Sequence, residues 1–187
     1  IKKMYNGNYL LGVHIADVAY YIKPNSNLFK EALKRGTSVY LGNVVIPMIP
    51  STLSNGICSL NEGVDRLTKS CVMEINTKGK IVNYKIFDSV INSKKKMTYE
   101  ELNEIFKTGQ IEDESYIPFL PSIKLARELS NILTTTKNKR GNLDFESSDM
   151  KIKIDDNDIP TEFILTNNEE AEKIIENFMI IANETVA

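Results

Sequence analysis

The residues that could carry out chemistry are few in this sequence. His14 is the only histidine, and it lies in an apolar run, where a hydrogen-bonded structural histidine is more common than a catalytic base. Asp155 and Asp156 are neighbours in a turn-like stretch, so their carboxylates point apart rather than toward one metal ion. Cys58 and Cys71 are separated by twelve residues, a spacing that fits neither a zinc site nor a redox pair. These residues alone predict no catalytic centre.

The composition is that of an ordinary globular domain. The chain has 187 residues, of which 42% are hydrophobic and 26% charged, enough for one domain with a buried core. No apolar run approaches the length that crosses a bilayer, so we expect no membrane partner. Both cysteines are expected to be reduced, which predicts a cytoplasmic location. The sequence contains no glycine-rich phosphate loop and no nucleophile elbow, so the residue types alone do not define a function.

Charge is distributed unevenly between the two halves of the chain. Residues 1–97 hold 14 Lys/Arg and 6 Asp/Glu, whereas residues 98–187 hold 9 and 19. Such asymmetry indicates a basic face and an acidic face. The alternative is that the two halves pair with each other in the fold.

The pattern of apolar residues predicts strands, then helices, then strands, then a long helix, an order typical of an α+β fold. The clearest hairpin turns at residues 77–79, and Thr98 with Glu101 forms the signal for a capped helix. We expect a mixed, mostly antiparallel sheet with packed helices and a loop over residues 51–65. Strands are expected at 9–18, 37–41, 44–50, 70–76, 80–91, 143–145, 150–154 and 163–165, and helices at 28–35, 98–107, 123–139 and 169–187.

Seven blocks of the sequence, in collinear order, resemble the catalytic (RNB) domain of the ribonuclease II/R family. Two of them, 53–61 and 64–67, are most similar to the ribonuclease R branch. The resemblance extends over the whole chain, so we expect residues 1–187 to form a single partial domain that is truncated at both ends. The other blocks are 12–18, 31–41, 45–50, 140–146 and 171–183.

The resemblance implies a processive 3′→5′ exoribonuclease that hydrolyses single-stranded RNA to nucleoside 5′-monophosphates. In the family, four aspartates hold Mg²⁺, which activates a water. They lie just before the strand that matches residues 9–18, and residues 1–8 contain no aspartate. A catalytic arginine follows the helix that matches 169–187. We therefore expect walls of the RNA path in this chain, but no catalytic or metal-binding residue.

Four residues match positions of the family that line the RNA path. Tyr40 and Phe145 match two aromatic rings that stack on bases near the 3′ end, a contact that holds RNA without reading its sequence. The alternative is that both rings belong to the core. Glu176 matches a helix carboxylate that accepts a hydrogen bond from a ribose hydroxyl, and the alternative is a solvated glutamate. Arg66 could contact phosphate or pair with a carboxylate of the channel, and the alternative is a structural ion pair with Asp65.

Two further features have more than one interpretation. Asp17 follows a strand near the expected metal site and could orient a ligand, although capping the next turn is the more common role. The run Lys94–Lys96 is either a solvated surface or a basic surface where RNA arrives.

Three function classes remain from the sequence. The first is the exoribonuclease. The second is a non-catalytic RNA-binding or scaffolding relative, and the third is an unrelated α+β interaction domain that does not bind RNA. Because a domain that is cut at both ends exposes apolar surface, self-association is also expected.

Overall fold

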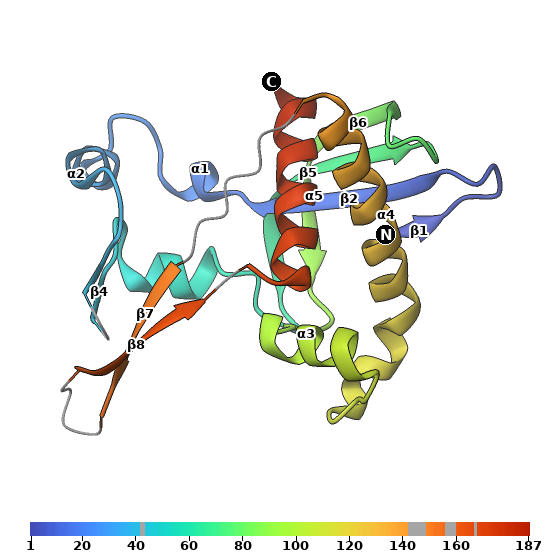
Figure 1. The fold of residues 1–187 in the computed structure, drawn as a ribbon. Helices are drawn as coiled ribbons and strands as arrows, with labels where there is room; N and C mark the ends of the chain where they lie inside the picture. The colour runs from blue at the N-terminus through green and yellow to red at the C-terminus, as the bar shows by residue number, and fades with distance from the viewer. Residues whose placement is uncertain (42–43, 142–148, 156–159, 167) are drawn as a thin grey trace.

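The computed structural model describes residues 1–41, 44–141, 149–155, 160–166 and 168–187. A four-stranded sheet with helices on one face forms the main body, and two separate two-stranded ribbons lie beyond one end of the sheet (Figure 1). Every strand pair is antiparallel, which confirms the predicted α+β fold with a mostly antiparallel sheet.

The sheet has the strand order β1-β2-β5-β6. In the second half of β5, alternate side chains enter the core, namely those of Cys71, Met73 and Ile75. Thr68 and Ser70 are buried on the opposite face of the strand. The predicted hairpin is confirmed, and it is longer than expected. The strands are β1 (Lys2–Lys3), β2 (Tyr9–Ala16), β5 (Asp65–Ile75) and β6 (Ile81–Asn92).

The hairpin turn between β5 and β6 is fixed by one side chain. The carboxamide oxygen of Asn76 accepts hydrogen bonds from the backbone N–H groups of Lys78 and Lys80, at 2.9 and 3.0 Å. Gly79 has a φ of 73°, a conformation that favours glycine. The turn therefore has a defined shape.

Helices α4 (Leu120–Lys139) and α5 (Glu170–Val186) pack on one face of the sheet, and α3 (Tyr99–Thr108) leads to α4 through the 3₁₀ turn η2 (Glu114–Phe119). The core lies between this face and the two helices. Its buried members are Tyr9, Leu11, Cys71, Met73, Ile75, Leu129, Leu133, Ile181 and Ala182.

Polar side chains join the helices to one another. The Asn103 side chain of α3 accepts a hydrogen bond from the Ala171 N–H at 2.8 Å, in the first turn of α5. Since Glu169, the residue before α5, makes no capping bond, Asn103 satisfies an N–H that would otherwise lack a partner. Asn177 of α5 donates to the hydroxyl of Ser130 in α4 at 2.9 Å.

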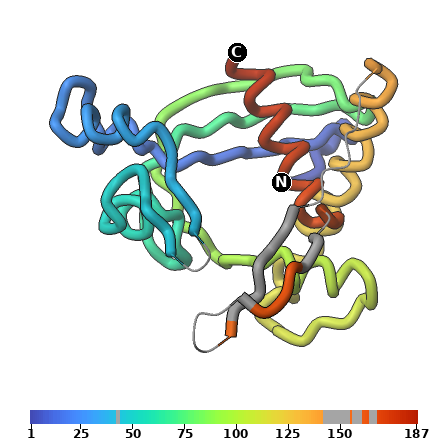
Figure 2. The backbone as a smooth tube through the Cα atoms, turned by 60° about the vertical axis from the view of Figure 1, so that its left-hand side comes forward, coloured from blue at the N-terminus to red at the C-terminus, as the bar shows by residue number. Residues whose placement is uncertain are grey.

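The remaining elements extend from the main body as an arm. They are α1 (Val18–Tyr21), α2 (Asn27–Arg35), the ribbon β3 (Val39–Leu41) with β4 (Val44–Ile46), and the π-helix η1 (Thr52–Ile57). A second ribbon consists of β7 (Asp149–Ile154) and β8 (Pro160–Thr166). Figure 2 shows this arm at the end of the sheet opposite the β5–β6 turn.

Some predicted boundaries were wrong. The strand expected at 9–18 ends at Ala16, because Asp17 caps α1. The loop expected at 51–65 contains the π-helix η1. The strand expected at 143–145 lies outside the described residues. In the described part of the chain, no helix is long and apolar enough to cross a membrane.

Candidate nucleic-acid interface

Tyr40 lies in the middle of β3, opposite Val45 of β4, and its residue is 74% exposed. Within the described residues the ring is therefore not part of the core, and its stacking on a base stays a prediction. Two contacts attach the ribbon to its surroundings: Arg35 donates to the Pro47 carbonyl at 3.0 Å, and the Met48 N–H donates to the Ser38 hydroxyl at 2.9 Å. The structure thus presents Tyr40 as an open aromatic face.

Phe145 lies in the segment 142–148, outside the described residues. The predicted pairing of its ring with that of Tyr40 therefore stays a prediction.

Glu176 is exposed on α5, where its carboxylate lies 3.5 Å from the ammonium of Lys137 on α4. An ion pair of this length at a solvated surface contributes little to stability. The carboxylate is therefore accessible to a ligand, and its contact with ribose stays a prediction.

Arg66 makes a different structural contact from the one expected. Its guanidinium donates to the carbonyls of Ser59 at 2.9 Å and Asp65 at 3.0 Å, and it lies 3.5 Å from the carbonyl of Gly56. The carboxylate of Asp65 instead accepts from the Asn92 amide at 2.8 Å, so the predicted Arg66–Asp65 ion pair is wrong. Arg66 fastens η1 to the sheet, and its contact with phosphate stays untested.

His14 makes the hydrogen bond expected of a structural histidine, although the residue is exposed in this chain. Its Nδ1 atom lies 2.6 Å from the Ser70 hydroxyl, which also contacts the hydroxyl of Ser89 at 2.5 Å. Partial desolvation of the ring lowers the pKa of His14 below its ordinary value. A Cβ atom at Gly12 would lie 2.8 Å from the imidazole Nε2, so the ring occupies the space that a larger residue would need.

The structure gives local contacts for Asp17 and for the lysine run 94–96. Asp17 caps α1 by accepting from the Tyr20 N–H at 3.1 Å, which confirms its capping role. In the run 94–96, Lys95 binds the Asp113 carboxylate at 2.8 Å and holds the pKa of that group at about 2. The middle of this run is therefore structural, and a role in RNA binding stays a prediction for its neighbours.

No cluster of three or more His, Cys, Asp or Glu side chains that could hold a metal ion occurs within the described ranges. The side chains present there do not fit a magnesium site. The expectation that the metal ligands lie elsewhere stays a prediction.

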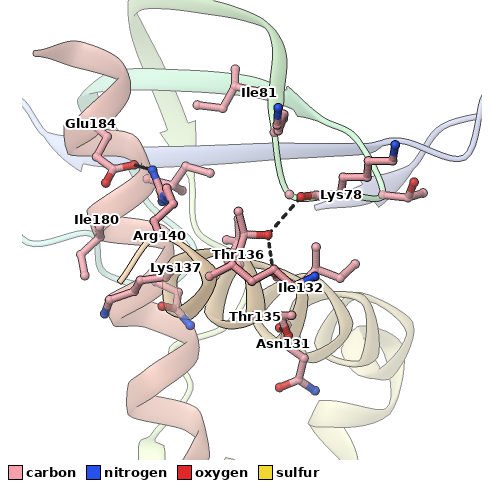
Figure 3. A pocket seen from close by; sticks show the side chains of 17 residues that line it. Lys78, Ile81, Asn131, Ile132, Thr135, Thr136, Lys137, Arg140, Ile180 and Glu184 are labelled. Carbon is pink, nitrogen blue, oxygen red and sulfur yellow. Dashed lines mark hydrogen bonds and ion pairs between the residues drawn. The ribbon is translucent and has the colours of Figure 1, made fainter. Parts of the chain in front are cut away.

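Sequence reasoning missed a groove of about 1010 Å³ between the β5–β6 turn, the end of α4 and α5 (Figure 3). Lys78 and Lys80 flank the turn glycine, but nothing local indicates that α4 lies beside them. The groove arises from contacts between residues far apart in the chain.

A sheet covered by two helices on one face, with an arm at one end, is the α+β architecture that the sequence blocks predicted. The model of the RNB domain matches residues 1–187, and the chain belongs to this family.

The similar proteins are bacterial ribonucleases R. The chain is 53% identical over its whole length to ribonuclease R of Thermotoga maritima and 46% identical to ribonuclease R 1 of Lactococcus lactis, covering 26% and 23% of their lengths. The structure of Mycoplasma genitalium RNase R in complex with double-stranded RNA superimposes with a TM-score of 0.91 at 34% identity. That match covers 100% of this chain and 33% of the relative. The chain therefore spans about a quarter of the length of these curated relatives.

Proposed function

We propose that this chain is part of the catalytic domain of a 3′→5′ exoribonuclease that hydrolyses single-stranded RNA processively to nucleoside 5′-monophosphates. The observation that carries the proposal is the match to ribonuclease R over the whole chain, in sequence and in fold. The activity belongs to the longer protein, of which this chain supplies one part.

The contribution of this part is to line the RNA path. Tyr40 stacks on a base near the 3′ end, and Phe145 and Glu176 line the same path. Mg²⁺, when bound, activates the attacking water, and its aspartate ligands lie outside residues 1–187. The chain alone is therefore expected to be inactive.

A partial domain is supported by the exposed side chains of β6. This strand is apolar in sequence, yet Val82, Tyr84, Ile86 and Val90 are all at least 44% exposed. Among the described residues, β6 pairs only with β5, so one edge of the strand is open. We take this surface as the place where the rest of the domain packs.

A non-catalytic relative is the second candidate. Yeast Ssd1, described as a pseudonuclease, has the same fold with a TM-score of 0.72 at 22% identity, so the fold alone does not decide between the candidates. Hydrolysis does decide: labelled oligo(A) with Mg²⁺ is expected to release mononucleotides with the longer protein and none with the 187-residue chain. Robust hydrolysis by the chain alone would contradict the placement of the metal ligands.

The role of Tyr40 is tested in the longer protein. Replacing Tyr40 with Ala removes one base stack, worth about 1–3 kcal/mol, so RNA affinity should fall by roughly 5- to 150-fold. Tyr40→Phe keeps the ring and should bind as the unaltered protein does. The melting temperature should not change, because the side chain is exposed. Equal affinity of all three proteins would exclude the stacking role.

Single-stranded RNA is thus the proposed partner. The cytoplasmic location stays a prediction that rests on two free cysteines, Cys58 and Cys71.

A further inference from the structure

We propose that the groove between the β5–β6 turn, α4 and α5 is a second contact surface for RNA, which binds the phosphate backbone of the strand away from its 3′ end. The inference rests on the proposed function, since it assumes that RNA is the substrate. It adds a surface that is separate from the ribbon that carries Tyr40.

The charged residues that line the groove are predominantly basic. The chain as a whole has a net charge of −2, and its second half is acidic. The groove collects basic residues from both halves. Its charged lining residues are Lys78, Lys80, Lys137, Lys139 and Arg140, against the single acid Glu184.

Among the described residues, three of the five basic side chains are free to meet a ligand, whereas Lys137 pairs with Glu176 at 3.5 Å. Arg140 lies 3.7 Å from Glu184, the one acid in the lining (Figure 3). Lys78, Lys80 and Lys139 have no ion-pair or hydrogen-bond partner for their ammonium groups in the part of the chain that the structure describes. Basic residues in the last turn of α4 also stabilise the helix dipole, so they have a second explanation. Lys78 and Lys80 have no such role, because they lie on the hairpin turn.

The groove is held in shape before any ligand arrives. The Thr136 hydroxyl of α4 donates to the Lys78 carbonyl at 3.0 Å, a contact that Figure 3 shows across the groove floor. A Cβ atom at Gly79 would lie 2.8 Å from the same hydroxyl, so only glycine permits this approach. With the turn fixed by Asn76, the two turn lysines and the end of α4 keep a constant separation.

The lining also indicates which part of RNA would bind. It contains no aromatic residue, so it offers no surface for base stacking. Ammonium and guanidinium groups bind phosphates without regard to sequence, and such binding depends steeply on salt because counterions are released. The groove therefore fits the sugar–phosphate backbone rather than the bases.

The position of the groove sets a length requirement. The β5–β6 turn and the β3–β4 ribbon lie at opposite ends of the sheet in both views (Figures 1 and 2). Glu176, which we place on the RNA path, pairs with Lys137 at one side of the groove, so the groove adjoins that path. A short RNA that ends at Glu176 should leave the turn lysines Lys78 and Lys80 free, whereas a longer RNA should contact them as well.

The experiment uses the longer protein in a chelating buffer, which prevents hydrolysis, and measures the affinity for a short and a long oligo(A) over a range of salt concentrations. The variant Lys78→Gln/Lys80→Gln removes two phosphate contacts. The slope of log affinity against log salt should become shallower by about 1.4 for the long RNA, at about 0.7 per contact. Binding of the short RNA should not change.

The matched control is Lys124→Gln/Lys173→Gln, which removes two exposed lysines from α4 and α5 at positions outside the groove. An unchanged slope in the groove variant, or an equal change in the control, would overturn the inference. The inference would also be overturned if Lys78→Gln/Lys80→Gln lowered the melting temperature and left the RNA affinity unchanged. That result would mean that an acidic segment of the protein fills the groove. Hydrolysis of the short RNA by the unaltered protein tests the proposed function separately.

Discussion

His14 and Ser70 are directly opposite each other on β2 and β5, and the imidazole Nδ1 lies 2.6 Å from the serine hydroxyl oxygen. This cross-strand pair adds a side-chain bond to the backbone ladder at the centre of the sheet. Ser70 is itself 1% exposed, so its hydroxyl depends on protein partners rather than water. We therefore expect exchange of either residue to lower the stability of the sheet.

Protonation of His14 should destabilise the fold. Partial desolvation of the ring, in a residue that is exposed overall, lowers the pKa of His14 below its ordinary value of 6.5, so the unfolded state takes up the proton more readily than the folded state. The contribution of neutral His14 is full above that value and is lost as the pH falls through the lowered pKa. Thermal unfolding of the protein and of His14→Gln should show a stability difference that shrinks with falling pH. A constant difference would contradict this assignment.

Gly12 and His14 should be energetically coupled. A Cβ atom at position 12 would lie 2.8 Å from Nε2 of the imidazole, so Gly12→Ala must displace the ring. In the His14→Ala variant the imidazole is absent, so Gly12→Ala should lower the free energy of unfolding by less. Urea unfolding of the two single variants and the double variant should give a coupling energy of about 0.5–3 kcal/mol. If the stability changes of the two single variants add up to that of the double variant, the imidazole can move aside with no loss of stability.

Arg66 should not be replaceable by lysine. Its guanidinium is directed at carbonyls of the segment that contains η1, a pattern that a single ammonium cannot reproduce. Arg66→Lys is expected to cost about 1–3 kcal/mol and to speed amide exchange in η1. Asp65→Asn is the control, and it should change stability by less than about 0.5 kcal/mol because Asp65 does not pair with the guanidinium. Equal losses of stability in Arg66→Lys and Asp65→Asn would indicate that Arg66 and Asp65 do form an ion pair.

The exposed face of β6 should make the isolated chain self-associate. Ile86 and Val90 are 44% and 60% exposed on a strand with an open edge. Ile86→Lys/Val90→Lys should reduce concentration-dependent association of the 187-residue chain in sedimentation velocity. Leu33→Lys, which changes a residue on α2 that is 71% exposed, should not reduce it. Association that persists in the β6 variant would place the contact elsewhere.

The local elements could be predicted because their signals lie within a few residues. Thr98 caps α3 by accepting from the Glu101 N–H at 3.3 Å, and Ser26 caps α2 by accepting from the Phe29 N–H at 3.1 Å. The hairpin turn at Gly79 has the same local character. Such bonds connect neighbours, so residue spacing in the sequence is enough to indicate them.

The elements that were missed depend on distant partners. The first turn of α5 is capped by Asn103, which accepts a hydrogen bond from the Ala171 N–H. The two residues are 68 positions apart in the sequence. The groove exists because Thr136 meets Lys78 from 58 residues away. The exposed position of Tyr40 likewise depends on how the arm leaves the sheet, and an apolar strand pattern alone favours a buried ring.

The strand order of the sheet has a consequence for folding kinetics. β5 and β6 follow each other directly, so their long hairpin closes only a small loop and should form early. β2 must pair with β5 across the whole arm, and Ala16 is opposite Thr68, so this step closes a much larger loop. We therefore expect docking of β2 to be slower than formation of the hairpin, and substitutions at its contact with β5 should delay refolding more than those in the hairpin turn.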